Sequence, residues 1–96
     1  MKTLVLMISL LSSVTFAADA TNGQKLYKAC ISCHGQSGEG NPAMKAPRIG
    51  GQHDWYLLTQ LNMFKSKERK NPAMFPFIKN LSESDFADLS AYISTL

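Results

Sequence analysis

The feature that most constrains this chain is the pentad Cys30-Ile31-Ser32-Cys33-His34. Residues three positions apart in a helical turn project to nearly the same side. Two thiols placed in this way can form thioethers with the two vinyl groups on one edge of a haem, and the adjacent imidazole can then reach the iron. This spacing is the attachment signature of c-type haem. The sequence therefore predicts one covalently bound haem c, held by Cys30, Cys33 and His34.

Other uses of the two cysteines are less favoured. A thioredoxin-like Cys-x-x-Cys site needs a βαβ unit, and no such pattern surrounds the pentad. A zinc site needs four ligands, which here would be Cys30, Cys33, His34 and His53. A disulfide between Cys30 and Cys33 would close a very small strained ring and would add little to stability.

The N-terminal residues have the order of a secretory signal peptide. A positive start at Lys2 precedes an apolar run at 4–11, and small-residue cleavage sites follow at 15–17 and 18–20. The site Ala18-Asp19-Ala20 fits the small-x-small rule best, and the site that ends at Ala17 fits it nearly as well. The apolar run is too short to span a bilayer as a helix. We expect residues 1–20 to be a signal peptide cleaved somewhere after Ala17 to Ala20. Residues 21–96 would form the mature domain in the periplasm or outside the cell.

The mature chain is too short to be stable without help. Cleavage would leave 76 to 79 of the 96 residues, and a chain of this size buries only about 60% of its unfolded surface. Such chains usually need covalent cross-links or a cofactor to be stable, and two cysteines are too few for a framework of disulfides. The net charge of +3 is not the strongly basic footprint of a nucleic-acid-binding protein.

Hydrophobic side chains recur at helical spacing in three segments. These predict helices over about 20–31, 54–67 and 83–95. Asp54 is expected to cap the second helix. Ser82 and Asp85 are expected to form a capping box at the third, with Asp85 and Asp88 facing water.

The segments between these helices are rich in glycine and proline. Residues 35–51 hold five glycines and two prolines, and residues 71–80 hold Pro72 and Pro76. Both are expected to be irregular, and no period-two strand pattern is convincing. The sequence therefore predicts an all-α fold of about three main helices wrapped around one haem.

Haem iron has a second axial position, for which His53, Met44, Met63 and Met74 are candidates. His53, near a helix start, is expected at the surface. Met63 lies within the second helix and is expected to pack in the core or against the haem, while Met44 follows His34 by only ten residues. Met74 follows it by 40 residues, in an irregular segment that would let the chain pass around the haem to its opposite face. Met74 is the ligand we expect.

The chain resembles a small class I cytochrome c, in particular one haem domain of the bacterial cytochrome c4 group. The matching segments are Gly23 to Tyr27, Cys30 to Gly35, Ala46 to Gln52, Tyr56 to Leu61, Arg69 to Met74, and Leu81-Ser82 into a last helix ending near Tyr92. Cytochrome c4 itself carries two such domains, whereas this chain carries one.

The resemblance implies roles for residues outside the pentad. It assigns Met74 as the axial ligand and gives the Pro47 carbonyl as the acceptor of a hydrogen bond from His34, although Pro47 could also merely stiffen a turn. It further implies that the first and last helices cross, with Gly23 and Tyr27 lying against residues 89–93.

Iron ligated by His34 and Met74 would have no open position, so the expected chemistry is one-electron transfer and not enzymatic turnover. We expect a monomeric carrier that meets a reductase or oxidase through an acidic patch on that partner. A basic cluster could steer this encounter, or it could be only a solvated helix end; its members are Lys65, Lys67, Arg69 and Lys70. The alternatives are a haem-bearing subunit of a larger oxidoreductase, and a haem enzyme or gas binder in which the methionine bond is weak.

Overall fold

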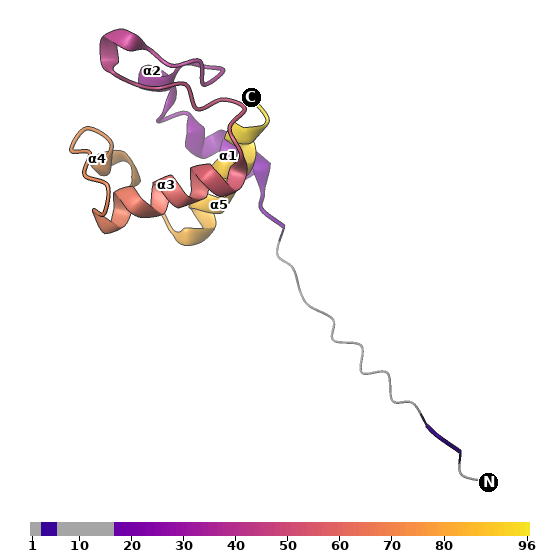
Figure 1. The fold of residues 1–96 in the computed structure, drawn as a ribbon. Helices are drawn as coiled ribbons and strands as arrows, with labels where there is room; N and C mark the ends of the chain where they lie inside the picture. The colour runs from indigo at the N-terminus through magenta and orange to yellow at the C-terminus, as the bar shows by residue number, and fades with distance from the viewer. Residues whose placement is uncertain (1–2, 6–16) are drawn as a thin grey trace.

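A computed structural model of the chain describes residues 3–5 and 17–96, and its regular structure in these ranges is helical (Figure 1). The elements are α1 (Ala20–Tyr27), α2 (Ile31–His34), the short 3₁₀ helix η1 (Pro42–Met44), α3 (Asp54–Ser66), α4 (Phe75–Ile78) and α5 (Glu83–Ser94). Apart from one isolated bridge between Asn41 and Ala46, the described residues contain no β-structure. The expected all-α fold is confirmed.

Most of the expected signal peptide, residues 1–2 and 6–16, lies outside the described residues. Among the helices that the structure describes, none has the length and apolar character needed to cross a membrane.

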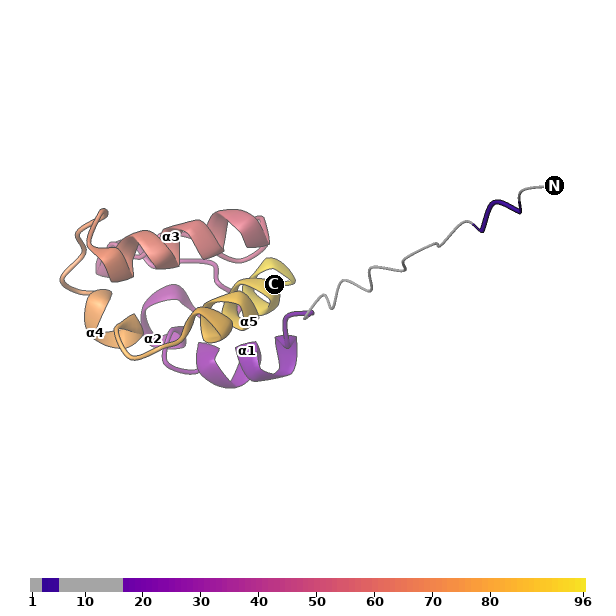
Figure 2. The ribbon, with the colours of Figure 1, turned by 90° about the horizontal axis from the view of Figure 1, so that it is seen from below.

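Helix α5 lies between α1 and α3 (Figure 2) and packs against both. Two groups of buried side chains result. The first comprises Tyr27, Leu57, Leu89 and Ile93, and the second Phe64, Ile78 and Phe86. The second group joins α5 to the C-terminal half of α3 and to α4, so both ends of α5 are anchored in apolar contacts.

Helices α1 and α5 cross at Gly23, as the resemblance implied. A Cβ atom at Gly23 would lie 2.1 Å from the backbone oxygen of Asp88 and 2.8 Å from the Cβ of Tyr92. The rings of Tyr27 and Tyr92 meet one turn further on, with centroids 5.6 Å apart. Only glycine allows the two backbones to approach this closely.

The first helix ends earlier than the sequence predicts, at Tyr27 instead of Ile31. The next amides bond carbonyls three residues back, including Cys30 N–H to the Tyr27 carbonyl at 2.8 Å. Such bonds tighten the last turn and end a helix. Cys30 consequently takes the N-cap position of α2, and Cys33 and His34 lie within that helix.

The start of α3 also differs from expectation by one residue. His53 occupies the N-cap position, and Asp54 is the first helical residue, with its carboxylate accepting from the Trp55 N–H at 2.7 Å. The expected capping box of α5 is confirmed, because Asp85 N–H donates to Ser82 Oγ at 3.0 Å and Ser82 N–H donates to Asp85 Oδ2 at 3.1 Å. The hydrogen bond from the Ser82 backbone holds the pKa of the Asp85 carboxyl below its ordinary value.

Asp88 was expected to face water, and this was wrong. It is buried, with 7% of its surface exposed, and its carboxylate accepts from the Asp19 N–H at 2.7 Å and from Asn22 Nδ2 at 2.9 Å. Helical periodicity placed it opposite the apolar face. The close crossing of α1 over α5 covers that position.

The segment 71–80 was expected to be irregular throughout, but it contains α4. The side chain of Asn71 accepts from the backbone N–H groups of Ala73 and Met74, at 3.1 and 3.2 Å, and so starts the turn. Pro76 lies at the beginning of α4, where a helix needs no N–H donor. Met74 is therefore the residue at the N-cap position of a short helix.

We expect Gly23→Ala to lower the free energy of unfolding by about 2–3 kcal/mol, because the added Cβ forces α1 away from the α5 backbone. Denaturant titration of the haem-loaded protein measures this change. Gln24→Ala, on the exposed side of α1, should change stability by less than about 0.5 kcal/mol. Equal stability of the two variants would contradict the close crossing.

Candidate functional site

The two cysteines of the pentad are half-buried free thiols, with no disulfide between them. Burial is the main cause that raises the pKa of the Cys30 thiol to about 11, with a smaller contribution from Cys33. A redox-active Cys-x-x-Cys pair needs a thiol of lowered pKa. This environment therefore disfavours the thioredoxin-like interpretation.

No group of three or more histidine, cysteine, aspartate or glutamate side chains within the described ranges is arranged to hold a metal ion. The zinc interpretation needed Cys30, Cys33, His34 and His53 together. The structure therefore gives it no support.

The side chain of His34 is buried and oriented by one hydrogen bond. Its Nδ1 atom lies 2.9 Å from the carbonyl oxygen of Pro47, and 6% of the residue is exposed. A carbonyl can only accept, so Nδ1 carries the proton, and in the neutral ring the Nε2 lone pair is left to bind a metal. Ligating histidines in proteins are usually oriented in this way. The expected contact between Pro47 and His34 is confirmed.

The loop that carries Pro47 is tied to the pentad by backbone hydrogen bonds. The Gly40 N–H donates to the His34 carbonyl at 2.8 Å, and the N–H groups of Ile49 and Gly50 both donate to the Gly38 carbonyl at 2.9 Å. Gly38 has a φ of +66°, and a Cβ there would lie 2.6 Å from the nitrogen of Gly50. Glycine is therefore required at position 38, and the position of the Pro47 carbonyl depends on this tight loop.

Helix α1 fixes the start of the same loop. The Tyr27 hydroxyl donates to the Gly35 carbonyl at 2.6 Å. Burial raises the pKa of this phenol to about 12, so it stays protonated and able to donate at any physiological pH. Sequence reasoning placed Tyr27 at the helix crossing and missed this second role. The one sequence feature that could have indicated this hydrogen bond is the position of Tyr27, seven residues before His34.

The candidates for a second iron ligand differ in their surroundings. Met74 is half-buried and packs against the cluster of Phe64, Ile78 and Phe86. Met44 on η1 is 56% exposed. Met74 precedes α4 as its N-cap residue, and His34 is the last residue of α2.

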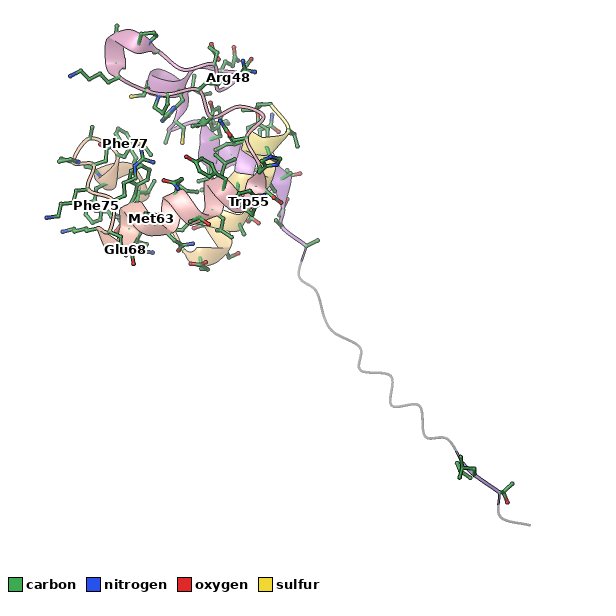
Figure 3. The ribbon with its side chains drawn as sticks, viewed as in Figure 1. Arg48, Trp55, Met63, Glu68, Phe75 and Phe77 are labelled. Atoms are coloured by element: carbon green, nitrogen blue, oxygen red, sulfur yellow. The ribbon has the colours of Figure 1, made fainter. Side chains whose placement is uncertain are left out.

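The remaining two candidates lie on or beside α3. Met63 is half-buried within that helix (Figure 3). His53 is exposed and stacks on Trp55, with ring centroids 5.6 Å apart and planes at 15°. His53 is thus a surface residue, as expected.

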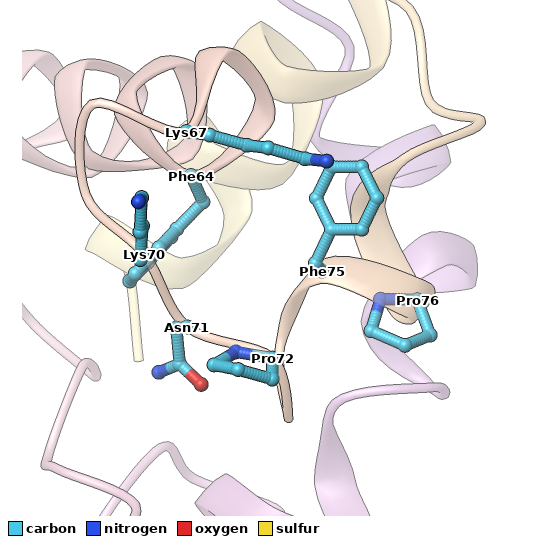
Figure 4. A pocket seen from close by; sticks show the side chains of 7 residues that line it. All are labelled: Phe64, Lys67, Lys70, Asn71, Pro72, Phe75 and Pro76. Carbon is cyan, nitrogen blue, oxygen red and sulfur yellow. The ribbon is translucent and has the colours of Figure 1, made fainter.

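A surface hollow of about 460 Å³ lies between the end of α3 and α4 (Figure 4). Its walls are Phe64, Lys67, Lys70, Asn71, Pro72, Phe75 and Pro76. The pentad is not part of this lining, and neither is Met74. The hollow therefore belongs to the basic flank of the molecule, with Lys67 and Lys70 in its wall.

The four basic residues of the expected cluster are all exposed. Three of them lie over aromatic rings: Lys65 at 5.3 Å from the Phe86 centroid, Lys67 at 4.9 Å from Phe75, and Arg69 at 4.7 Å from Phe64. These contacts stabilise the α3–α4 corner. The charges nevertheless remain on the surface, so the cluster has both a structural role and a positive field.

We expect Tyr27→Phe to lower the free energy of unfolding by about 1 kcal/mol, because the Gly35 carbonyl loses its donor. Thermal or denaturant unfolding measures the loss. Tyr92→Phe is the matched control, because the two rings are in contact and, of these two tyrosines, Tyr27 is the one whose hydroxyl donates a hydrogen bond to a described residue. Equal losses in both variants would show that the bond to Gly35 is not important.

Comparison with known proteins agrees with this geometry. Residues 20–96 match the family model described as cytochrome c. Cytochrome c4 of Pseudomonas aeruginosa is 36% identical over 92 residues, covering 96% of this chain and 45% of that protein. Cytochrome c-554(548) of Halomonas halodenitrificans is 35% identical over 82 residues, covering 82% of this chain and 98% of that protein. The chain thus spans about half the length of the cytochrome c4 and nearly all of the shorter relative.

A solved structure shares the fold. The thiosulfate dehydrogenase from Marichromatium purpuratum aligns with a TM-score of 0.76 and 31% identity, over 80% of this chain and 18% of that one. The family match covers every described element from α1 to α5. The chain therefore belongs to the cytochrome c family, whose domain carries haem c bound covalently to the polypeptide.

Proposed function

We propose that this protein is a one-electron carrier with a single haem c. Cys30 and Cys33 would hold the haem through thioethers, and His34 and Met74 would be the axial ligands of its iron. The observation that carries the proposal is the hydrogen bond from His34 Nδ1 to the Pro47 carbonyl. It leaves the neutral imidazole with one free nitrogen, immediately after two free thiols at the haem-attachment spacing.

When bound, the haem supplies the change between Fe(II) and Fe(III). The polypeptide supplies the setting. Pro47 fixes the tautomer and the direction of the His34 ring, and the bond from Tyr27 to Gly35 holds the following turn. Met74 packs against Phe64, Ile78 and Phe86. As an iron ligand, its thioether would favour the less charged reduced iron and so would raise the reduction potential.

Two protein ligands on the iron would leave no position for a substrate, so the proposed role is carrier and not enzyme. The apolar N-terminal run favours export, with the mature domain acting in the periplasm or outside the cell as a monomer. Its proposed partners are a redox protein that delivers the electron and one that receives it. The basic cluster on the α3–α4 corner fits an acidic surface on such a partner.

The alternative is a haem-bearing subunit of a larger oxidoreductase. It is favoured by the similarity to a thiosulfate dehydrogenase, of which this chain spans 18%. The two functions differ in an observable property. A complex that survives purification from the native cell would support the subunit, and an isolated monomer that exchanges electrons with several partners would support the carrier.

We expect Met74→Ala to abolish the weak far-red absorption band of the oxidised protein and to let carbon monoxide bind the reduced protein without denaturant. The reduction potential should fall by an amount on the order of 100 mV, because a thioether ligand is lost. Absorption spectra and a redox titration of one purified sample measure all three changes.

The matched controls are Met63→Leu and Met44→Leu. Both should keep the far-red band, because Met44 is exposed on η1 and Met63 lies within α3. If Met74→Ala keeps the band and one of these variants loses it, the assignment of the axial ligand is wrong.

We expect the double variant Lys67→Gln, Lys70→Gln to slow oxidation of the reduced protein by ferricyanide roughly threefold or more at low ionic strength, because positive charge steers the anionic oxidant. The effect should disappear in high salt. The control removes the same charge from α1 and its C-terminal turn, with Lys25→Gln and Lys28→Gln. Equal slowing in both double variants would show that net charge matters and the α3–α4 corner does not.

A further inference from the structure

The buried carboxylate of Asp88 is a group that electron transfer does not explain. It lies in the middle of α5, at the crossing with α1, and 7% of the residue is exposed. Its two oxygens accept from the Asp19 N–H at 2.7 Å and from Asn22 Nδ2 at 2.9 Å. Neither donor carries a charge, and a buried carboxylate is costly without a nearby positive group.

Asp19 is part of the folded domain although it precedes α1. Its side chain accepts from the N–H groups of Thr21 and Asn22, at 2.9 and 3.2 Å, and so forms the N-cap of α1. Its carbonyl accepts from the Gly23 N–H at 3.0 Å. The Asp19 N–H donates to the Asp88 carboxylate. Asp19 therefore links the start of α1 to α5.

This arrangement discriminates between the two small-residue cleavage sites. Cleavage after Ala20 would remove Asp19, and Asp88 would lose one of its two donors. It would also place the new ammonium group on Thr21, in the first turn of α1. Positive charge is unfavourable there because the N-terminal end of a helix is itself partially positive.

Cleavage after Ala17 has the opposite effects. Asp19 remains as the cap and as a donor to Asp88. The new ammonium group belongs to Ala18, which directly precedes Asp19. It places a positive charge near the carboxylates of Asp19 and Asp88, whose hydrogen-bond donors are all uncharged. Ala17 and Ala18 are both exposed, so the peptide bond between them is accessible.

We propose that the precursor is cut between Ala17 and Ala18, and that Asp88 and the Asp19 cap hold the mature N-terminus on α5. The proposal rests on the export included in the proposed function, and it is independent of the haem ligands. Its failure would leave the spectrum of the protein unchanged, whereas failure of the haem assignment would leave the N-terminus unchanged.

The first test is the N-terminus of the protein itself. The full chain is expressed in a bacterium that has haem-attachment machinery, and the product is examined by intact mass and N-terminal sequencing. We expect a chain that begins at Ala18. A product that begins at Thr21, or one that keeps residues 1–17, would overturn the proposal.

The second test asks whether Asp88 stabilises the packing of the N-terminal segment against α5. In the mature haem-loaded protein, Asp88→Asn should lower Tm by about 4–8 °C. Glu68→Gln, at an exposed carboxylate outside α5, is the matched control and should leave Tm nearly unchanged. If the two variants behave alike, Asp88 does not hold the N-terminus.

A precursor without residues 18–20 covers the case in which Asp88→Asn does not accumulate. Cleavage after Ala17 then gives a mature chain that begins at Thr21. We expect its Tm to fall by at least as much as in Asp88→Asn, because the cap and the donor are both absent. An unchanged Tm would overturn the proposal, because Asp19 would then contribute nothing to the fold.

Discussion

The hydrogen bond between His34 and Pro47 is the interaction on which the site depends. It joins α2 to a loop that has no regular structure beyond η1, and it decides which nitrogen of the imidazole is free. The loop can hold Pro47 in place because Gly38 and Gly50 bring its two arms into backbone contact. A change in that loop is therefore also a change in the direction of the proposed iron ligand.

The crossing of α1 and α5 also helps to hold His34 in place, because Tyr27 at this crossing bonds the turn that follows His34. Gly23 lets α1 approach α5, and Tyr27, one turn later, lies in the core while its hydroxyl reaches the Gly35 carbonyl. The same crossing buries Asp88 and ties it to Asp19. The α1–α5 pair thus holds Tyr27, which bonds the turn after the pentad, and Asp19, which lies at the proposed start of the mature chain.

The sequence predicted those features of the helices that depend only on residues close together in the chain. The capping box of Ser82 and Asp85 uses groups three residues apart, so the sequence shows both partners. The end of α1 and the presence of α4 were missed, because they depend on turn hydrogen bonds at Cys30 and Asn71 that periodicity does not report. Asp88 was misplaced because its burial comes from α1, 66 to 69 residues away in the chain.

The sequence by itself determined the cofactor class, because attachment chemistry needs only two thiols and an imidazole at fixed short spacing. It also determined the all-α class, since helical periodicity is a property of neighbouring residues. Only the tertiary structure decided that Asp88 is buried, that Met44 is exposed and Met74 is packed in an apolar cluster, and that Tyr27 supports the turn after His34. The burial of a side chain and its hydrogen-bond partners depend on contacts between segments that are far apart in the chain. A local sequence pattern does not show which segments come into contact.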